Sequence, residues 1–109
     1  MSYRVVFSPE VREQLVELYR YIAEAASPDI AARYTEAIVI YCESLCTSPL
    51  RGTKRDDVRP GLRITNYKKR AVIAFDVDAD VVSIIGVFYG GQDYETILQD
   101  DSDDSSTGH

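Results

Sequence analysis

This chain of 109 residues contains one histidine, two cysteines and no tryptophan. The histidine is the final residue, His109, and is incidental to any folded site. Without a second histidine, neither a Ser–His nor a Cys–His pair is available to activate a nucleophile. Cys42 and Cys46 fall on one face of an expected helix, a spacing that suits a disulfide poorly. We therefore expect reduced packing cysteines, no metal and no cofactor.

Two short patterns that could hold an ion or a phosphate are incomplete. Asp76, Asp78 and Asp80 alternate through a turn, but the further oxygen ligands and the glycine of a calcium loop are missing. Gly90-Gly91 lacks the wider spacing and the following lysine of a phosphate-binding loop. We interpret the three aspartates as solvated turn residues.

Long hydrophobic runs are also missing. No apolar segment approaches the length of a membrane-spanning helix, and the N-terminus lacks a secretory pattern. We expect a cytoplasmic protein that makes no membrane contact. At this length the chain has room for a single hydrophobic core.

Charge is unevenly distributed along the chain. The formal net charge is −6, and the last ten positions are rich in aspartate. Residues 99–109 are polar, small and acidic, so we expect a disordered tail after one domain formed by residues 1–98. Between Arg51 and Arg70, eight basic residues stand against two acidic ones, a local balance of +6. Such a stretch favours an acidic protein partner and salt-sensitive association.

The N-terminal half predicts a strand and a helical hairpin. Residues 3–7 alternate in polarity, as in a strand with one buried side. Ser8-Pro9 and Ser27-Pro28 each combine a capping serine with a proline at the first helical position. They predict helices over residues 9–26 and 28–47, with apolar stripes that would pack on a sheet. Because almost no linker separates them, the helices must run antiparallel.

The C-terminal half predicts three strands. After a break near Pro49, a basic connection leads to a short strand over residues 62–65. Two apolar runs, 71–77 and 81–88, flank an acidic turn and predict a β-hairpin. Since both faces of these runs are apolar, we expect helices to cover one face. Something must cover part of the other, and a protein partner is one candidate.

The order of these elements defines the fold class. A strand, two helices and three further strands, β-α-α-β-β-β, predict an α+β fold with a mostly antiparallel sheet. Beyond the last strand, Tyr94, Ile97 and Leu98 are expected to pack one final helical turn.

The basic stretch and its tyrosines leave an enzymatic interpretation open. With Tyr67 and Tyr89, it could neutralise phosphates and stack a base. Cleavage of RNA needs a base for the 2′-hydroxyl and an acid for the leaving oxygen. Arg70 could stabilise the transition-state charge and Tyr89 could be a weak acid, but no residue stands out as the base. A solvated rim, or a surface for an acidic protein, is the alternative.

In their order and spacing, these segments resemble the RelE/ParE superfamily of toxins from type II toxin–antitoxin modules, most closely its ParE branch. The resemblance covers residues 3–98. Its motifs are Phe7 followed by Ser8-Pro9, the helical hairpin, the Pro49–Gly52 break, Pro60-Gly61-Leu62-Arg63, Arg70 at the start of the third strand, and Val87-Phe88-Tyr89-Gly90.

The resemblance implies a small toxin neutralised by a cognate, ParD-like antitoxin in multiples of a 1:1 complex. ParE-like members are described as poisons of DNA gyrase, and RelE-like members as ribosome-dependent endoribonucleases that cut messenger RNA. The missing base favours a non-enzymatic gyrase inhibitor, with the endoribonuclease as the alternative. A member that only binds its antitoxin is a third possibility. We expect no sequence-specific DNA binding by the toxin alone.

The resemblance also points to candidate target residues. Arg70 and Tyr89 match positions that act in the cleaving branch, although Tyr89 stands where members often have histidine. Together with Arg63 they are our candidates for target binding. In the endoribonuclease alternative, Arg70 and Tyr89 are the catalytic candidates.

Candidate antitoxin contacts come from the helices. Tyr19, Tyr34 and Tyr41 lie in the helical hairpin, and aromatic anchors suit protein interfaces. We expect an extended or helical antitoxin segment to cross the hairpin and the sheet.

Overall fold

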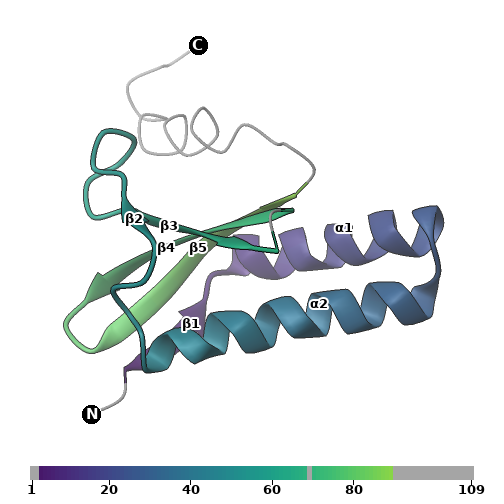
Figure 1. The fold of residues 1–109 in the computed structure, drawn as a ribbon, viewed down its shortest axis with the longest axis horizontal. Helices are drawn as coiled ribbons and strands as arrows, with labels where there is room; N and C mark the ends of the chain where they lie inside the picture. The colour runs from purple at the N-terminus through teal and green to yellow at the C-terminus, as the bar shows by residue number, and fades with distance from the viewer. Residues whose placement is uncertain (1–2, 69, 90–109) are drawn as a thin grey trace.

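The computed structural model describes residues 3–68 and 70–89. In this part of the chain, five strands form one sheet in the order β1-β5-β4-β3-β2, and a helical hairpin lies along one face (Figure 1). The elements are β1 (Arg4–Phe7), α1 (Pro9–Ala25), α2 (Pro28–Glu43), the 3-10 turn η1 (Ser44–Cys46), β2 (Thr53–Lys54), β3 (Arg63–Tyr67), β4 (Ala71–Asp78) and β5 (Val81–Tyr89). β1 pairs with β5 in parallel, and the other pairs are antiparallel. The predicted α+β fold with a mostly antiparallel sheet is confirmed.

Both helices begin at the capping serines that the sequence indicated. Ser8 Oγ accepts a hydrogen bond from the backbone N–H of Val11 at 3.2 Å. Ser27 Oγ accepts one from the N–H of Ile30, also at 3.2 Å. Each serine satisfies a donor that the first helical turn leaves unpaired, and the proline after it lacks the N–H that would need such a partner.

The end of α2 differs from the prediction. A helix to residue 47 is too long, because α2 stops at Glu43 and the 3-10 turn η1 follows. Ser44 Oγ donates to the carbonyl of Tyr41, and Thr47 Oγ1 donates to the carbonyl of Ser44. Hydroxyl groups that bond to nearby carbonyls compete with regular helix geometry, which accounts for the tighter turn.

The β4–β5 hairpin is the centre of the sheet. Its register runs from Ala71 opposite Tyr89 to Asp78 opposite Val81, with an irregularity beside Ala74. There Ile85 of β5 has no partner residue on β4, as in a β-bulge. Predicted as two apolar runs around an acidic turn, the hairpin is confirmed.

The connection from η1 to β3 depends on a glycine. Gly52 has a φ of +82°, and a Cβ at this position would lie 2.2 Å from the carbonyl oxygen of Ile64. The two residues of β2 follow at once and pair with the start of β3. We did not predict β2, because a two-residue strand leaves no alternation in the sequence.

Two hydrophobic clusters lie on opposite faces of the sheet. The larger lies between the hairpin and the sheet and includes Val11, Leu18, Ile22, Ala31, Ile38, Cys42, Ile73, Phe75, Val82 and Ile84. The smaller joins Val58 and Leu62, from the connection before β3, to Ile64, Ala74 and Phe88 of the sheet. The chain itself thus covers part of the face for which a protein partner was one candidate.

The cysteines and the turn aspartates take mostly the positions expected of them. Cys42 is fully buried, and burial, with a smaller effect from the neighbouring Glu43 charge, raises its pKa to about 12. Asp78 and Asp80 are exposed, as predicted. Asp76 is half-buried instead, so burial and then the Asp78 charge raise its pKa, while Arg59 opposes the rise.

Some predictions fall outside the described residues. They concern the final helical turn around Tyr94, Ile97 and Leu98, the acidic tail of residues 99–109, and Gly90-Gly91. Within residues 3–68 and 70–89, no helix is both long and apolar enough to cross a membrane.

Candidate functional site: a tyrosine row beside basic residues

Three tyrosines meet at the end of the sheet where β3, β4 and β5 come together. Tyr67 and Tyr89 both pair with Ala71, which lies between them on the central strand. Cross-strand neighbours project from the same face, so the small Ala71 leaves space between the two rings. Tyr34 of α2 packs there, with its ring centroid 5.9 Å from that of Tyr67 and 5.6 Å from that of Tyr89.

Two more tyrosines extend this group at either end. The Tyr41 ring centroid lies 5.2 Å from that of Tyr67, and the Tyr21 centroid lies 5.8 Å from that of Tyr89. We call the sequence of contacts Tyr41–Tyr67–Tyr34–Tyr89–Tyr21 the tyrosine row. Its rings meet edge to face or tilted, the favourable geometry for aromatic pairs. The row ties α1 and α2 to β3 and β5.

The hydroxyl groups of the row differ in their hydrogen bonds. The Tyr41 hydroxyl lies 2.9 Å from Oγ1 of the buried Thr65, and either oxygen can donate. The Tyr34 hydroxyl is buried and has no hydrogen-bond partner among the described residues. Burial raises the pKa of Tyr34, the phenols of Tyr89 and Tyr67 raise it further, and the positive charge of Arg70 opposes the rise.

Basic side chains border the row on the β3 side. The Arg51 guanidinium lies 5.5 Å from the centroid of the Tyr41 ring, and Lys68 Nζ lies 5.6 Å from that of Tyr67. Both are cation–π contacts. Arg70 is exposed and directly precedes Ala71. The tyrosine row is therefore accompanied by three positive charges.

Two further basic residues of the Arg51–Arg70 stretch, Lys54 and Arg55, pair with neighbouring aspartates. Lys54 Nζ lies 3.7 Å from Asp56 Oδ2, and Arg55 Nη2 lies 2.9 Å from Asp57 Oδ2. Its hydrogen bond to Arg55 lowers the pKa of Asp57. These internal ion pairs reduce the positive charge that the stretch can offer to the predicted acidic protein partner.

Arg63 has a structural set of contacts. Its Nη2 donates to the carbonyl oxygen of Leu50 at 2.6 Å, and its Nε donates to that of Arg51 at 3.3 Å. These bonds hold the chain ahead of Gly52 against β3. Arg63 lies at the opposite end of β3 from Tyr67, about 13 Å along the strand.

A second surface, which we call the outer groove, lies between the two helices. It has a volume of about 560 Å³ and is lined by Leu15, Val16, Tyr19, Ala32, Thr35, Glu36 and Val39. Val16 is 49% exposed and Tyr19 37% exposed. Ala32 and Val39 lie about half a helical turn away from Tyr34 and Tyr41 on α2. The outer groove and the tyrosine row are therefore separate surfaces.

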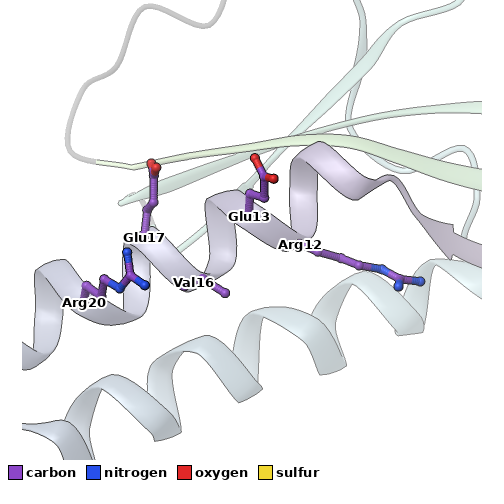
Figure 2. Close-up of a pocket in the computed structure, with 5 residues that line it drawn as sticks. All are labelled: Arg12, Glu13, Val16, Glu17 and Arg20. Carbon is purple, nitrogen blue, oxygen red and sulfur yellow. The ribbon is translucent and has the colours of Figure 1, made fainter.

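A smaller depression of about 340 Å³ adjoins the outer groove on α1. Its lining residues are Arg12, Glu13, Val16, Glu17 and Arg20. Figure 2 shows Glu13 and Glu17 on one side of the helix, while Val16 projects toward α2. An exposed apolar centre is thus bordered by charges of both signs.

The described residues offer no site for a metal ion, since no three side chains of histidine, cysteine, aspartate or glutamate come together among them. Among the described residues, the tyrosine row with its basic residues and the outer groove are the two candidate surfaces for function.

Comparison with known proteins identifies the family. A family model for the ParE toxin of the type II toxin–antitoxin system parDE matches residues 5–94. The chain belongs to the ParE toxin family. The predicted membership of the RelE/ParE superfamily is thereby confirmed. No curated protein matches the sequence.

Two solved structures share the ParE-like fold. The chromosomal ParDE system of P. aeruginosa matches with a TM-score of 0.72 and 17% identity, over 81% of this chain and 96% of that chain. The RelBE2 toxin–antitoxin complex of Mycobacterium tuberculosis matches with a TM-score of 0.58 and 22% identity, over 83% and 100%. At these identities the likeness concerns the fold.

The target-site candidates of this ParE-family chain are only partly brought together. Arg70 and Tyr89 are close, because Tyr89 pairs with the residue that follows Arg70. Arg63 lies at the other end of the β3–β4 ladder, where Arg63 pairs with Phe75. The positions of Arg63, Arg70 and Tyr89 do not test binding to a target, so their role in target binding stays a prediction.

The antitoxin candidates divide between the two surfaces. Tyr34 and Tyr41 pack toward the sheet in the tyrosine row, whereas Tyr19 lines the outer groove. Sequence reasoning missed the roles of Tyr21 and Ala71. The seven-residue spacing of Tyr34 and Tyr41 indicated a shared helical face, but only the strand register shows which rings meet that face.

Proposed function

We propose that this ParE-family protein is a bacterial toxin that inhibits DNA gyrase and is neutralised by a cognate, ParD-like antitoxin. The observation that carries the proposal is the match of residues 5–94 to the ParE toxin family. Both similar structures belong to toxin–antitoxin systems, which supports an antitoxin partner. Gyrase inhibition would take place in the cytoplasm.

The contacts of the candidate residues support inhibition by protein contact rather than cleavage of RNA. Tyr89 has ring contacts with Tyr21 and Tyr34, so it packs the helices onto the sheet. Arg63 donates to two backbone carbonyls. A ribonuclease needs a group that accepts the 2′-hydroxyl proton, and the sequence indicated no residue for that role.

The outer groove is the surface that best suits the antitoxin. Val16 and Tyr19 are apolar or aromatic and partly exposed, and the groove continues between the helices to Val39. An antitoxin helix could place apolar side chains there at helical spacing, as other groove-bound helices do. The charges around Val16 would fix its direction. Of the three tyrosines predicted to contact the antitoxin, Tyr19, Tyr34 and Tyr41, the proposal keeps Tyr19, which lines this groove.

A supercoiling assay tests both parts of the proposal. Purified toxin should inhibit gyrase and trap cleaved DNA, and the antitoxin encoded beside it should restore supercoiling. The Val16→Glu variant should inhibit gyrase as the parent does but resist the antitoxin, since a buried unpaired carboxylate disfavours the complex. Ile30→Glu is the matched control, because Ile30 is 47% exposed and does not line the outer groove.

The outcomes separate the target from the partner surface. Unchanged supercoiling and no trapped DNA would exclude gyrase, and codon-positioned cuts in a translation reaction would then establish the endoribonuclease alternative. Equal rescue of Val16→Glu and Ile30→Glu by the antitoxin would exclude the outer groove as the contact surface.

A further inference from the structure

The Tyr34 hydroxyl is an unusual feature of the tyrosine row. It is buried and has no hydrogen-bond partner among the described residues. Most buried polar groups in proteins are paired, so an unpaired one calls for an explanation. A phenylalanine would make the same ring contacts with Tyr67 and Tyr89 without leaving a donor unused. The ring contacts therefore do not explain why a hydroxyl group is present at this position.

A positive charge lies near this donor. Arg70 is exposed and directly precedes Ala71, which pairs with both Tyr67 and Tyr89. Its charge lowers the pKa of the Tyr34 phenol, although burial has the largest effect on that pKa and raises it. The backbone N–H of Arg70 donates to the carbonyl of Tyr67 at 3.2 Å, which fixes the turn next to the tyrosine row. Lys68, on the same turn, is exposed and lies over the Tyr67 ring.

These cations are not neutralised within the described part of the chain. The ion pairs found there join Lys54 to Asp56 and Arg55 to Asp57, and neither includes Arg70 or Lys68. Guanidinium and phenol groups both donate hydrogen bonds, and a guanidinium fork matches the oxygens of phosphate and carboxylate groups. The location combines an unused donor with unneutralised positive charge.

We propose that the Tyr34 hydroxyl and the Arg70 guanidinium form a receptor for an oxyanion, a phosphate or carboxylate group. Lys68 adds attraction at longer range. Because Arg70 is exposed and the hydroxyl is buried, the anion meets the guanidinium first, and the hydroxyl donates to it once the rings of Tyr67 and Tyr89 shift to admit it. The receptor is separate from the outer groove and does not depend on gyrase as the target, so either proposal can fail without the other.

Titration of the full chain with inorganic phosphate tests the receptor. At constant ionic strength, followed by proton–nitrogen and tyrosine-ring NMR spectra, phosphate should cause saturable shifts at Tyr34, Tyr67 and Ala71. Sodium acetate is the second arm. A comparable response to acetate assigns a carboxylate receptor, and a response to phosphate alone assigns a phosphate receptor. No saturable response to either anion overturns the proposal.

Four variants locate the binding groups. Arg70→Gln should weaken binding at least about tenfold, and Tyr34→Phe about fivefold, since each removes a donor to the anion. Tyr41→Phe removes a hydroxyl that already has a partner, and Arg4→Gln removes an exposed charge opposite Val81, at the other end of β5 from Tyr89, so both should bind as the parent does. Spectra of Tyr34→Phe should show a folded chain. Binding unchanged in Tyr34→Phe, or weakened equally in Arg4→Gln and Arg70→Gln, overturns the proposal.

Discussion

At the scale of single residues, two tyrosines of α2 have opposite effects on stability. The Tyr34 hydroxyl is buried without a partner, whereas the Tyr41 hydroxyl bonds to Thr65. An unsatisfied buried hydroxyl costs about 1–3 kcal/mol, and a satisfied one contributes about 0.5–1.5 kcal/mol. The same hydroxyl group is thus expected to destabilise the fold at Tyr34 and to stabilise it at Tyr41.

Removal of each hydroxyl should therefore change stability in different directions. Tyr34→Phe should leave the free energy of unfolding unchanged or raise it by up to about 1 kcal/mol. Tyr41→Phe should lower it by about 1 kcal/mol, because Thr65 also loses its partner. Urea unfolding followed by circular dichroism measures both. Equal losses in the two variants would mean that the Tyr34 hydroxyl has a partner in solution.

The tyrosine row also shows where residue patterns stop being informative. The apolar stripes of the helices predicted which faces are buried, and Tyr34 and Tyr41 were rightly placed on a common face. A stripe does not reveal what packs against it. The contacts of Tyr34 depend on Ala71, which is distant in sequence and small enough to admit the ring. Such a fit is set by strand register, which the local sequence does not specify.

At the scale of elements, the connection between η1 and β3 depends on two glycines with different surroundings. Gly52 and Gly61 have φ angles of +82° and +80°. A Cβ at Gly52 would lie 2.2 Å from the carbonyl oxygen of Ile64, while nothing lies within 4 Å of one at Gly61. Substitution at the two positions therefore distinguishes the free-energy cost of a left-handed backbone from the additional cost of a steric clash.

Alanine at each glycine should show the difference. Gly61→Ala should lower the free energy of unfolding by about 1–2 kcal/mol, the cost of left-handed geometry for an L-residue. Gly52→Ala should lower it by at least about 3 kcal/mol, because β3 must also shift. Thermal unfolding measures both, at about 4–8 °C per kcal/mol for a domain of this size. Similar losses of stability in the two variants would mean that β3 can shift to relieve the clash at no cost in free energy.

Element prediction succeeded where the signals are local. Ser8 and Ser27 fixed the helix starts, because capping and proline geometry act within one turn. The end of α2 and the strand β2 were missed. The first depends on competing hydroxyl bonds near Ser44, and the second exists only through pairing with β3. Neither leaves a periodic pattern.

At the scale of the whole molecule, the two faces of the sheet carry separate clusters that share the same strands. Leu45 is fully buried in the helix-side cluster, and Leu62 is fully buried in the smaller cluster on the other face. Since β4 and β5 contribute to both clusters, loss of either should loosen the same central hairpin.

Truncation of these leucines tests that the molecule is one cooperative unit. Leu45→Ala and Leu62→Ala should each lower the free energy of unfolding by about 2–5 kcal/mol, with a single transition retained. Urea titrations monitored by tyrosine fluorescence measure the effect, since no tryptophan dominates the emission. A loss below about 1 kcal/mol for Leu62→Ala, or a second transition, would mean that the smaller cluster does not support the fold.

The parallel pairing of β1 with β5 has a consequence for the order of events during synthesis. Among the described residues, β1 pairs only with β5, and β5 is also the strand against which α1 packs most. Neither can reach its final place until residues 81–89 have left the ribosome. At about 5–20 residues per second, the ribosome needs several seconds to reach β5, and the sheet stays incomplete during that time. We therefore expect the native sheet, and any activity that needs it, to form only after the last described strand, β5, has emerged.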